Sequence, residues 1–382
     1  MSKIDDMIKK LCPNGVEYKE LRQVCNVIRG DRITKKDLID DGKYPVMSGG
    51  VTFFGRYSKA NRKANTITVA QYGSAGYVSF IKEDFWANDV CYSVIPCDFI
   101  DNRFLYYVLC HNQKHLYSLT TKAIPDCLPK ERLESISIPV PPLEIQEEIV
   151  RILDNFTELT AELTAELTAR RKQYEYYRDA LLSFGKVSPP LTSAFRCENV
   201  RWKTLGELAT INRGVRVTRD MLSEKGIPVY QNALTPLGYY SKSNRKGYKT
   251  FVISAGAAGK IGFSDCDFWA ADDCYTFDDL HDVSDKFIYY CLQSKQTYID
   301  SQVRRGSIPR ISRDVFANIK IPVPPIALQE RIVKTLDNFD KICSDLSIGL
   351  PAEISLRKKQ YEYYRDRILS FNTNVNNSIH GG

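Results

Sequence analysis

Long apolar runs are missing from this sequence, and so is the cysteine spacing of a metal or disulfide framework. The longest apolar stretch, Phe104 to Cys110, is far shorter than the ~20 residues that span a bilayer. The first residues, Met1 to Asp6, carry charge where an export signal needs an apolar run. The eleven cysteines include no Cys-x-x-Cys pair, so we expect reduced thiols. The protein is therefore expected to be soluble and cytoplasmic, without a membrane partner.

Motifs for catalysis are also missing. A DNA methyltransferase acting on amino groups needs an Asp/Asn-Pro-Pro-aromatic motif, whereas Val140–Leu143 and Val323–Ile326 lack both the polar first residue and the aromatic last one. The segment Gly256–Lys260 has the wrong glycine spacing for a phosphate-binding loop, and Ile261 stands where Ser or Thr should bind magnesium. We expect no enzymatic activity and no cofactor.

Histidines are few, and two of them lie one helical turn apart. His111 and His115 have the spacing of a helical metal pair, but no carboxylate motif accompanies them. A surface helix is the favoured interpretation, and no metal is expected.

What the sequence does have is internal repetition. The run Ile-Pro-Val-Pro-Pro occurs at Ile138–Pro142 and again at Ile321–Pro325, and each copy opens a helical stretch that closes on Lys-Gln-Tyr-Glu-Tyr-Tyr-Arg-Asp. Chance cannot give so many matches in one register, so the chain is one module written twice. Further matches, at an offset of 183 or 184, are Arg29-Gly30 with Arg213-Gly214, Ser58–Lys63 with Ser241–Lys246, and Phe85–Asp89 with Phe268–Asp272.

The two large regions, about 17–137 and 197–320, carry short β-like runs separated by turn signals. Thr66–Val69 and Phe251–Ser254 are examples of such runs. Helical segments are expected at about 101–117 and 285–296. This mixture predicts the α+β class.

After each Pro-Pro the apolar residues recur in steps of three and four, the pattern of a coiled coil. A narrow apolar stripe is unstable alone, so we infer that the two helices pair antiparallel within the chain and that a pseudo-two-fold axis relates the halves. The apolar positions are Ile149, Ile152, Phe156, Leu159, Leu163, Leu167, Tyr174, Tyr177, Leu181 and Phe184 in the first copy, and Ile332, Leu336, Phe339, Ile342, Leu346, Ile354, Tyr361, Tyr364, Ile368 and Phe371 in the second.

The two helical stretches differ in length. The first carries the unit Glu-Leu-Thr-Ala three times in tandem, from Glu158 to Ala169. The second contains Gly349-Leu350-Pro351, which should bend or interrupt the helix, because proline lacks the backbone donor. A four-residue unit repeated within a spacer would set its length.

These features together resemble the specificity subunit of a type I restriction-modification enzyme, over about residues 17–371. The resemblance implies an α+β fold in which two pseudo-symmetric α/β target recognition domains are separated by a pair of long antiparallel coiled-coil helices. Each domain would read one half of an asymmetric bipartite site in double-stranded DNA. The helices would set the half-site spacing and dock methyltransferase subunits, expected to be two, and restriction/translocase subunits would join through the complex.

The same resemblance places the domain boundaries. They are 1–142 for target recognition domain 1, 143–184 for spacer helix 1, 185–325 for target recognition domain 2, 326–371 for spacer helix 2, and 372–382 for a polar tail that we expect to be disordered.

Candidate DNA contacts begin with the two Lys-x-Asn-Arg-Lys loops, which put three cations into one short polar segment of each domain. The alternative is a solvated, charged structural turn. The net charge of +7 gives weak support for a polyanionic partner. The residues are Lys59, Asn61, Arg62 and Lys63 in the first loop, and Lys242, Asn244, Arg245 and Lys246 in the second.

Two further segments are candidates. The Gly-x-x-Gly turns would allow close approach of the backbone to a phosphate, or form only a tight hairpin. An arginine-rich segment fits bidentate guanine recognition, or is only a basic surface loop. The candidate residues are Ser74 and Lys260 at the glycine turns, Arg304, Arg305 and Arg310 in the arginine segment, and Lys122 in its counterpart in the first copy.

A function from another class also fits the pattern. A structural coiled-coil adaptor joining two protein-binding domains would have the same repeats. DNA binding that weakens steeply with salt distinguishes the two, because phosphate contacts release counterions.

Overall fold

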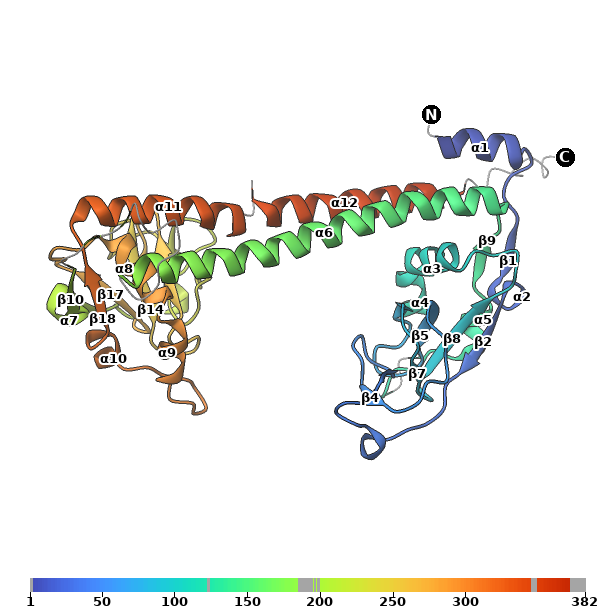
Figure 1. The fold of residues 1–382 in the computed structure, drawn as a ribbon, viewed down its shortest axis with the longest axis horizontal. Coiled ribbons are helices and arrows are strands. Elements are labelled where there is room, and N and C mark those ends of the chain that lie inside the picture. Colours follow the sequence, from blue (N-terminus) through green and yellow to red (C-terminus); the bar gives the residue numbers. More distant parts are fainter. Residues whose placement is uncertain are drawn as a thin grey trace. The chain divides into compact units, whose positions relative to one another are not determined.

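The computed structural model describes residues 3–121, 124–184, 195, 197, 200–344 and 349–371. It divides into two units. Unit 1 comprises Met1–Glu162 and Ile354–Gly382, and unit 2 comprises Leu163–Glu353. Each contains a domain of short strands and helices together with parts of the long helices (Figure 1). The predicted α+β class is confirmed. The expected polar tail, 372–382, lies outside the described residues.

The domain of unit 1 is built on a four-stranded antiparallel sheet in the order β2-β8-β5-β6. Its central strand β5 is buried at every position, which explains its unbroken β-branched and apolar sequence. A three-stranded sheet β4-β3-β7 and the pair β1-β9 complete it. The strands are β1 Tyr18–Glu20, β2 Cys25–Arg29, β3 Tyr44–Met47, β4 Gly55–Tyr57, β5 Thr66–Ala70, β6 Val78–Ile81, β7 Trp86–Ala87, β8 Cys91–Pro96 and β9 Ser137–Pro139. The short helices are α1 Lys3–Leu11, α2 Leu21–Val24, α3 Asn102–His111, α4 Gln113–Ser118 and α5 Lys130–Glu134.

The domain of unit 2 repeats this plan in the sheets β11-β17-β14-β15, β13-β12-β16 and β10-β18. The same strand order in both domains confirms that the sequence repeat is a structural repeat. The strands are β10 Arg201–Thr204, β11 Thr210–Arg213, β12 Ile227–Tyr230, β13 Gly238–Tyr240, β14 Lys249–Ile253, β15 Ile261–Ser264, β16 Trp269–Ala270, β17 Cys274–Asp278 and β18 Lys320–Val323. The short helices are α7 Leu205–Leu208, α8 Asp285–Gln293, α9 Gln296–Ser301 and α10 Arg313–Ala317.

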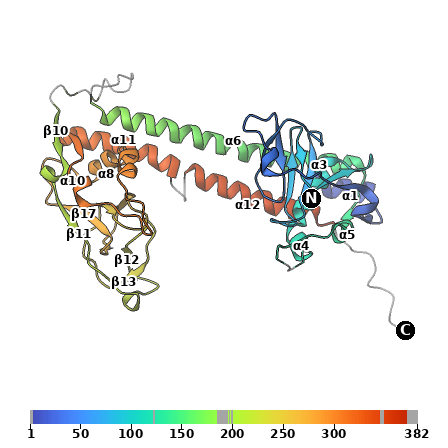
Figure 2. The ribbon, with the colours of Figure 1, turned by 90° about the horizontal axis from the view of Figure 1, so that it is seen from below.

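The long helices are α6 Leu143–Leu182, α11 Ile326–Ser344 and α12 Leu350–Leu369. Helix α6, of 40 residues, contributes its first half to unit 1 and its second half to unit 2. In unit 1 it lies antiparallel to α12, and in unit 2 antiparallel to α11 (Figures 1 and 2). The expected pairing is therefore present within each unit. None of the described helices is both long enough and apolar enough to cross a membrane.

Aromatic rings hold each helix pair together. In unit 1 Phe156 stacks on Tyr364 at 5.4 Å between ring centroids, and in unit 2 Tyr177 stacks on Phe339 at 5.9 Å. The second helical stretch consists of two helices, as its glycine and proline predicted. Pro351 lies in the first turn of α12, where its missing N–H costs nothing. Residues 345–348, between the two helices, lie outside the described range.

A buried glutamine attaches the domain of unit 1 to the start of α6. Gln146 is fully buried, and its amide nitrogen donates to the carbonyl oxygens of Phe99 (3.1 Å) and Pro141 (2.7 Å). Its amide oxygen accepts from the backbone N–H of Asp101 at 2.8 Å. One polar side chain thus satisfies three backbone groups, of which at least the Pro141 carbonyl is buried.

Unit 2 uses the same device at the start of α11. Gln329 is also fully buried, donates to the carbonyl oxygens of Asp282 and Pro324 at 2.8 Å each, and accepts from the N–H of Ser284 at 2.9 Å. About two turns further along each helix, an aspartate binds the adjacent domain helix. These contacts join Asp154 to Arg103 and Tyr107 of α3, and Asp337 to Lys286 and Tyr290 of α8.

The repeated tyrosine blocks pack against the domain of the other copy. Tyr174, in the first copy, is buried in unit 2 and donates to Gln293 of α8 at 3.2 Å. Tyr361, in the second copy, packs against Tyr107 of α3 in unit 1, with 6.5 Å between the ring centroids. Each domain is therefore held by helices from both copies of the module.

We call Gln146 and Gln329, with the backbone groups that they bind, the glutamine clamps. The clamp at Gln329 predicts a large effect on stability. Replacing Gln329 with leucine should lower the free energy of unfolding of unit 2 by about 3 kcal/mol, because an N–H and two carbonyl groups lose their partner at buried and partly buried positions. Thermal unfolding followed by circular dichroism measures the change. Gln302→Leu, on an exposed side chain of the same unit, is the matched control and should leave the midpoint nearly unchanged. Equal midpoints for both variants would contradict the clamp.

Candidate nucleic-acid interface

In domain 1 the Asn and Arg of the Lys-x-Asn-Arg-Lys loop bind their own domain. Asn61 exchanges hydrogen bonds with the backbone of Ala87 in β7, at 3.0 Å and 2.7 Å. The guanidinium of Arg62 donates to the Ser93 hydroxyl (2.9 Å) and to the carbonyl oxygens of Asn61 (2.8 Å) and Arg29 (3.0 Å). Both side chains are engaged in fixing the loop to the sheets, which favours the structural alternative for these two positions.

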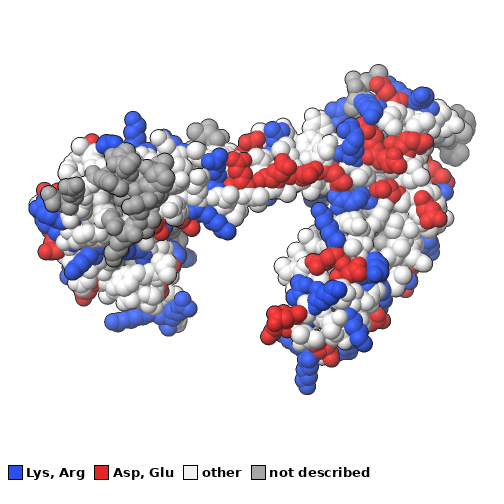
Figure 3. All heavy atoms as spheres, viewed as in Figure 1, with Lys and Arg blue, Asp and Glu red and all other residues white. Residues whose placement is uncertain are grey.

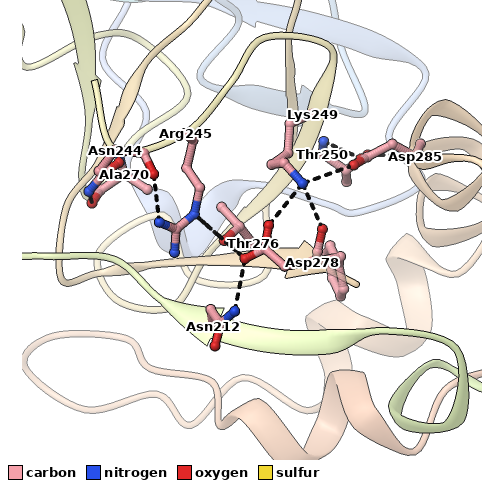
Figure 4. Close-up of polar contacts among 10 residues, drawn as sticks. Asn212, Asn244, Arg245, Lys249, Thr250, Ala270, Thr276, Asp278 and Asp285 are labelled. Carbon is pink, nitrogen blue, oxygen red and sulfur yellow. Dashed lines mark hydrogen bonds and ion pairs between the residues drawn. The ribbon is translucent and has the colours of Figure 1, made fainter. Parts of the chain in front are cut away.

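Domain 2 repeats the arrangement (Figure 4). Asn244 exchanges bonds of 2.9 Å and 2.7 Å with the backbone of Ala270, and Arg245 donates to the Thr276 hydroxyl at 2.7 Å. Its guanidinium also lies 3.7 Å from the Asp278 carboxylate. This arginine therefore points into its own domain.

Beside Arg245 lies an ionic network whose charged residues have uncharged counterparts in domain 1. Lys249 bridges the carboxylates of Asp278 (2.9 Å) and Asp285 (3.4 Å) (Figure 4). Burial raises the pKa of Asp285, whose hydrogen bonds from Thr250 and Lys249 offset only part of that cost. Burial also acts to raise the pKa of Asp278, but bonds from Asn212 and Lys249 outweigh it and hold the pKa below its usual value. Domain 1 has Thr66, Ile95 and Asn102 at the corresponding positions.

The lysines of these loops remain directed to solvent. Lys63 and Lys246 each approach an aspartate at 3.2 Å, Asp84 and Asp267 respectively. Their side chains are nevertheless 91% and 87% exposed, so these pairs contribute little to stability. The remaining cations of the two loops, Lys59 and Lys242, are exposed as well. Of the predicted loop contacts, the lysines are placed to reach a ligand.

The glycine turn of domain 1 joins β5 to β6. Gly73 and Gly76 have φ of 77° and 86°, a region that other residues rarely adopt. The backbone N–H of Ser74, between them, donates to the carbonyl oxygen of Gly49 at 2.7 Å. The turn is thus a tight hairpin that also holds the loop between β3 and β4.

In domain 2 the equivalent turn lies beside the arginine-rich segment. Gly256 and Gly259 both have φ of 84°, and the N–H of Gly256 donates to the Pro309 carbonyl at 3.1 Å. The backbones of Arg304 and Arg310 pair in both directions, at 2.9 Å and 3.1 Å. Two candidate segments that are far apart in the sequence are therefore neighbours in space.

The cations of this region differ in their surroundings. Lys260 pairs with Asp300 at 3.2 Å, whereas Arg304, Arg305 and Arg310 are exposed. Figure 3 shows Lys and Arg atoms at the tip of unit 2 that carries the loop following α9. Lys122, the candidate in the corresponding loop of domain 1, lies outside the described residues.

In each domain three loops converge: the glycine turn and two other loops that contact it. In unit 1 the turn contacts the β3–β4 loop through Gly49 and the loop ending at Cys127 through Tyr72. In unit 2 Ala257 bonds to Asn232 at 2.9 Å, and Ala255 pairs with Arg310. The three loops are 48–54, 71–77 and 124–127 in unit 1, and 231–237, 254–260 and 304–310 in unit 2.

The sequences of the converging loops differ strongly between the domains. The β3–β4 loop of domain 1 exposes Val51, Phe53 and Phe54, whereas the matching loop of domain 2 exposes Leu234 and Leu237. The two domains thus carry unlike surfaces on the same frame.

The structure places His115 at an exposed position and His111 at a half-buried one. The Nδ1 atom of His111 lies 2.9 Å from Asp366 of α12, and the Nδ1 atom of His115 lies 3.5 Å from the Ser118 hydroxyl. No group of three or more potential metal ligands occurs among the residues that the structure describes.

Sequence reasoning missed two sets of residues. The clamps Gln146 and Gln329 occupy equivalent positions after each Pro-Pro, and their recurrence was the available signal. The motif Arg-Gly-x-Arg also recurs, at Arg29–Arg32 and Arg213–Arg216, although matching the two copies by sequence identified only its first two residues.

The fold and the repeats agree with a defined class of chain. A model of the type I restriction modification DNA specificity domain matches residues 13–170 and again residues 198–356. The two matches together cover most of the chain, which therefore belongs to this family and carries two copies of its domain. The resemblance seen in the sequence is confirmed.

Relatives match over nearly their whole length. The specificity subunit of the type I restriction enzyme EcoR124I/EcoR124II of Escherichia coli is 30% identical, over 97% of this chain and 98% of that one. A Haemophilus influenzae protein assigned by name to the type I restriction enzyme specificity subunits is 29% identical, over 95% and 97%. The crystal structure of a type I system S subunit from M. genitalium shares the fold, with a TM-score of 0.67, 22% identity and coverage of 94% and 98%.

The contacts of Arg245 predict that it stabilises domain 2. Arg245→Ala should lower the free energy of unfolding by about 2 kcal/mol, because a charged donor is removed from partly buried acceptors. Lys246→Ala, which removes one positive charge from the neighbouring exposed position, should change it by less than about 0.5 kcal/mol. Thermal unfolding of both variants measures the difference. If Lys246→Ala were the more damaging change, the structural role of Arg245 would be wrong.

Proposed function

We propose that this chain is the DNA-recognition subunit of a type I restriction-modification system. Domain 1, within 1–142, and domain 2, within 185–325, each read one half of an asymmetric bipartite site. The observation that carries the proposal is the pair of like frames with unlike exposed loops, joined through one continuous helix. Like frames bind two half-sites in the same manner, and unlike loops give the half-sites different sequences.

The candidate residues divide into roles under this proposal. Exposed lysines and arginines bind phosphates, which supply most of the affinity, whereas side chains of the converging loops contact base edges. The exposed arginines of the 304–310 loop fit the major-groove edge of guanine. Arg62 and Arg245, which bind their own domains, hold the loops in place.

The spacer has two tasks in the proposal. Helix α6 sets the distance between the half-sites, because it is one unbroken helix that takes part in both units. The helices also dock methyltransferase subunits, and restriction/translocase subunits join through that complex. A chain from a study of complex assembly in a type I system shares this fold, with a TM-score of 0.58. The repeated tyrosines Tyr176 and Tyr363 stay exposed at equivalent positions and offer two like docking points, which fits two methyltransferase subunits.

Salt dependence tests DNA recognition. The full chain, alone or assembled with its methyltransferase subunits, should bind duplex DNA with an affinity that falls steeply as salt rises, by a slope of about 0.9 per phosphate contact. Fluorescence anisotropy at several salt concentrations measures it. The purified chain alone should show no methyltransferase, nuclease or ATPase activity.

Two outcomes would contradict the proposal. Cofactor-dependent methylation by the verified pure chain would make it an enzyme. Failure to bind any duplex, even with methyltransferase subunits present, would favour a coiled-coil adaptor that joins two protein-binding domains.

The tandem repeat in α6 tests the spacer role. Deleting Glu162–Ala165 removes one unit, which shortens the helix by about 6 Å and rotates its second half by about 40° relative to its first half. Since a base pair rises about 3.4 Å, both half-site sequences should persist while the gap between them shrinks by one or two base pairs. Sequencing the methylated sites of the variant and the parent measures the change.

The control for this deletion is a shorter one. Removing only Glu162 and Leu163 turns the apolar stripe by about 200°, so that variant should not fold stably. An altered half-site with an unchanged gap in the four-residue variant would contradict the proposal that α6 sets the distance between the half-sites.

A further inference from the structure

The Arg-Gly-x-Arg motif of domain 1 is held rigidly where it leaves β2. The Nε atom of Arg29 donates to the Asp89 carbonyl at 2.5 Å, and the Trp86 indole donates to the Asp31 carbonyl at 2.8 Å. A Cβ atom at Gly30 would lie 2.2 Å from a backbone oxygen of β7, so only glycine allows this approach. The first three residues of the motif therefore have clear roles in the fold.

Domain 2 holds its copy of the motif by the same contacts. Arg213 donates to the Asp272 carbonyl at 2.5 Å, and the Trp269 indole donates to the Val215 carbonyl at 2.7 Å. A Cβ atom at Gly214 would lie 2.1 Å from a backbone oxygen. In both domains the first three residues of the motif are thus held by the fold, and the fourth residue follows directly after them.

That residue is an arginine in both domains, and the fold does not use its side chain. Arg32 and Arg216 are exposed, and neither forms a hydrogen bond, an ion pair or a ring contact with any part of the chain that the structure describes. They differ in this from Arg62 and Arg245, whose recurrence is explained by their internal bonds. Common descent of a structural turn explains Arg29 and Gly30, but it does not explain why the fourth position is arginine twice.

Two half-sites of DNA can differ in their bases but not in their phosphates, and this suggests what the paired arginines bind. The converging loops have diverged between the domains, as expected if the two half-sites have different bases. The sugar-phosphate backbone is chemically the same at both half-sites. A cation that is kept in both domains without a role in the fold suits the part of the ligand that is common to both.

We propose that Arg32 and Arg216 are a matched pair of DNA phosphate contacts, one in each recognition domain. Lys59 and Lys242, which are exposed and recur in the same way, belong to the same set: Lys59 lies two residues before Asn61, whose side chain donates to the Asp31 carboxylate at 2.9 Å. The proposal rests on the function proposed above. It separates these shared contacts, which position the DNA, from the diverged loops, which read it.

The test measures non-specific and specific binding separately. Arg32→Ala, Arg216→Ala and the double variant are compared with the parent, as full chains assembled with methyltransferase subunits. The non-specific probe is a duplex of mixed sequence that is long enough to cover both domains. Each single variant should lower the slope of log affinity against log salt by about 0.9, and the double variant by about 1.8. Melting temperatures should not change.

Charge-matched variants complete the design. Arg32→Lys and Arg216→Lys keep the positive charge and should retain the parent slope. Arg22→Ala and Arg201→Ala remove a positive charge from exposed arginines that pair with Glu20 and Asp282, and they should leave the slope unchanged. Methylated sites sequenced from cells carrying the double variant should show the parent half-sites and the parent gap.

The possible outcomes are distinct. A parent slope in the double variant would overturn the proposal while leaving DNA recognition by the chain intact. An unchanged slope with an altered half-site would also overturn it, because these arginines would then contact bases. If the parent assembly itself binds no duplex, the proposed function fails, and this inference fails with it.

Discussion

The structure depends on one constraint: the apolar stripe of α6 is buried in two different cores. Ile145, Ile149 and Leu153 belong to the core of unit 1, whereas Tyr174 and Leu181 belong to that of unit 2. An α-helix rises about 1.5 Å and turns about 100° for each residue. The tandem Glu-Leu-Thr-Ala units lie between them, and of the residues in these units only Leu167 packs against either core, that of unit 2.

Attachment of domain 1 to α6 and of domain 2 to α11 bears on the proposed spacer role. Under the proposed spacer role, a helix could set the half-site gap only if each domain were held at a set angle to it. Gln146 and Gln329 bind loop carbonyls and N–H groups of their domains, and Asp154 and Asp337 bind α3 and α8. Each domain is thus attached to one long helix at two points about two turns apart. The tyrosine block of the other copy adds a third contact to each domain.

The sequence predicted the duplication and the helices well, because repeats and apolar periodicity are local signals that a single chain displays directly. It could not reveal the glutamine clamps, since the groups that Gln146 binds belong to Phe99 and Asp101, far away in the sequence. The same limit affected the candidate loops. Arg62 and Lys63 are neighbouring cations in a polar segment, and only distant groups, the Ser93 hydroxyl and the Arg29 carbonyl, distinguish the internal side chain from the exposed one.

The contacts of each recurring residue nevertheless separate the positions that build the common frame from those that form the surfaces. Positions that recur and bond internally, such as Asn61 with Asn244, explain the common frame. Positions that differ, such as the exposed aromatic residues of 48–54, belong to surfaces that have changed without loss of the frame. Because the anchors lie on β7 and β16 rather than in the converging loops, we expect substitutions in those loops to leave the sheet contacts in place. A module built in this way can acquire two unlike surfaces after duplication, and two unlike surfaces on one frame are what an asymmetric site in DNA requires.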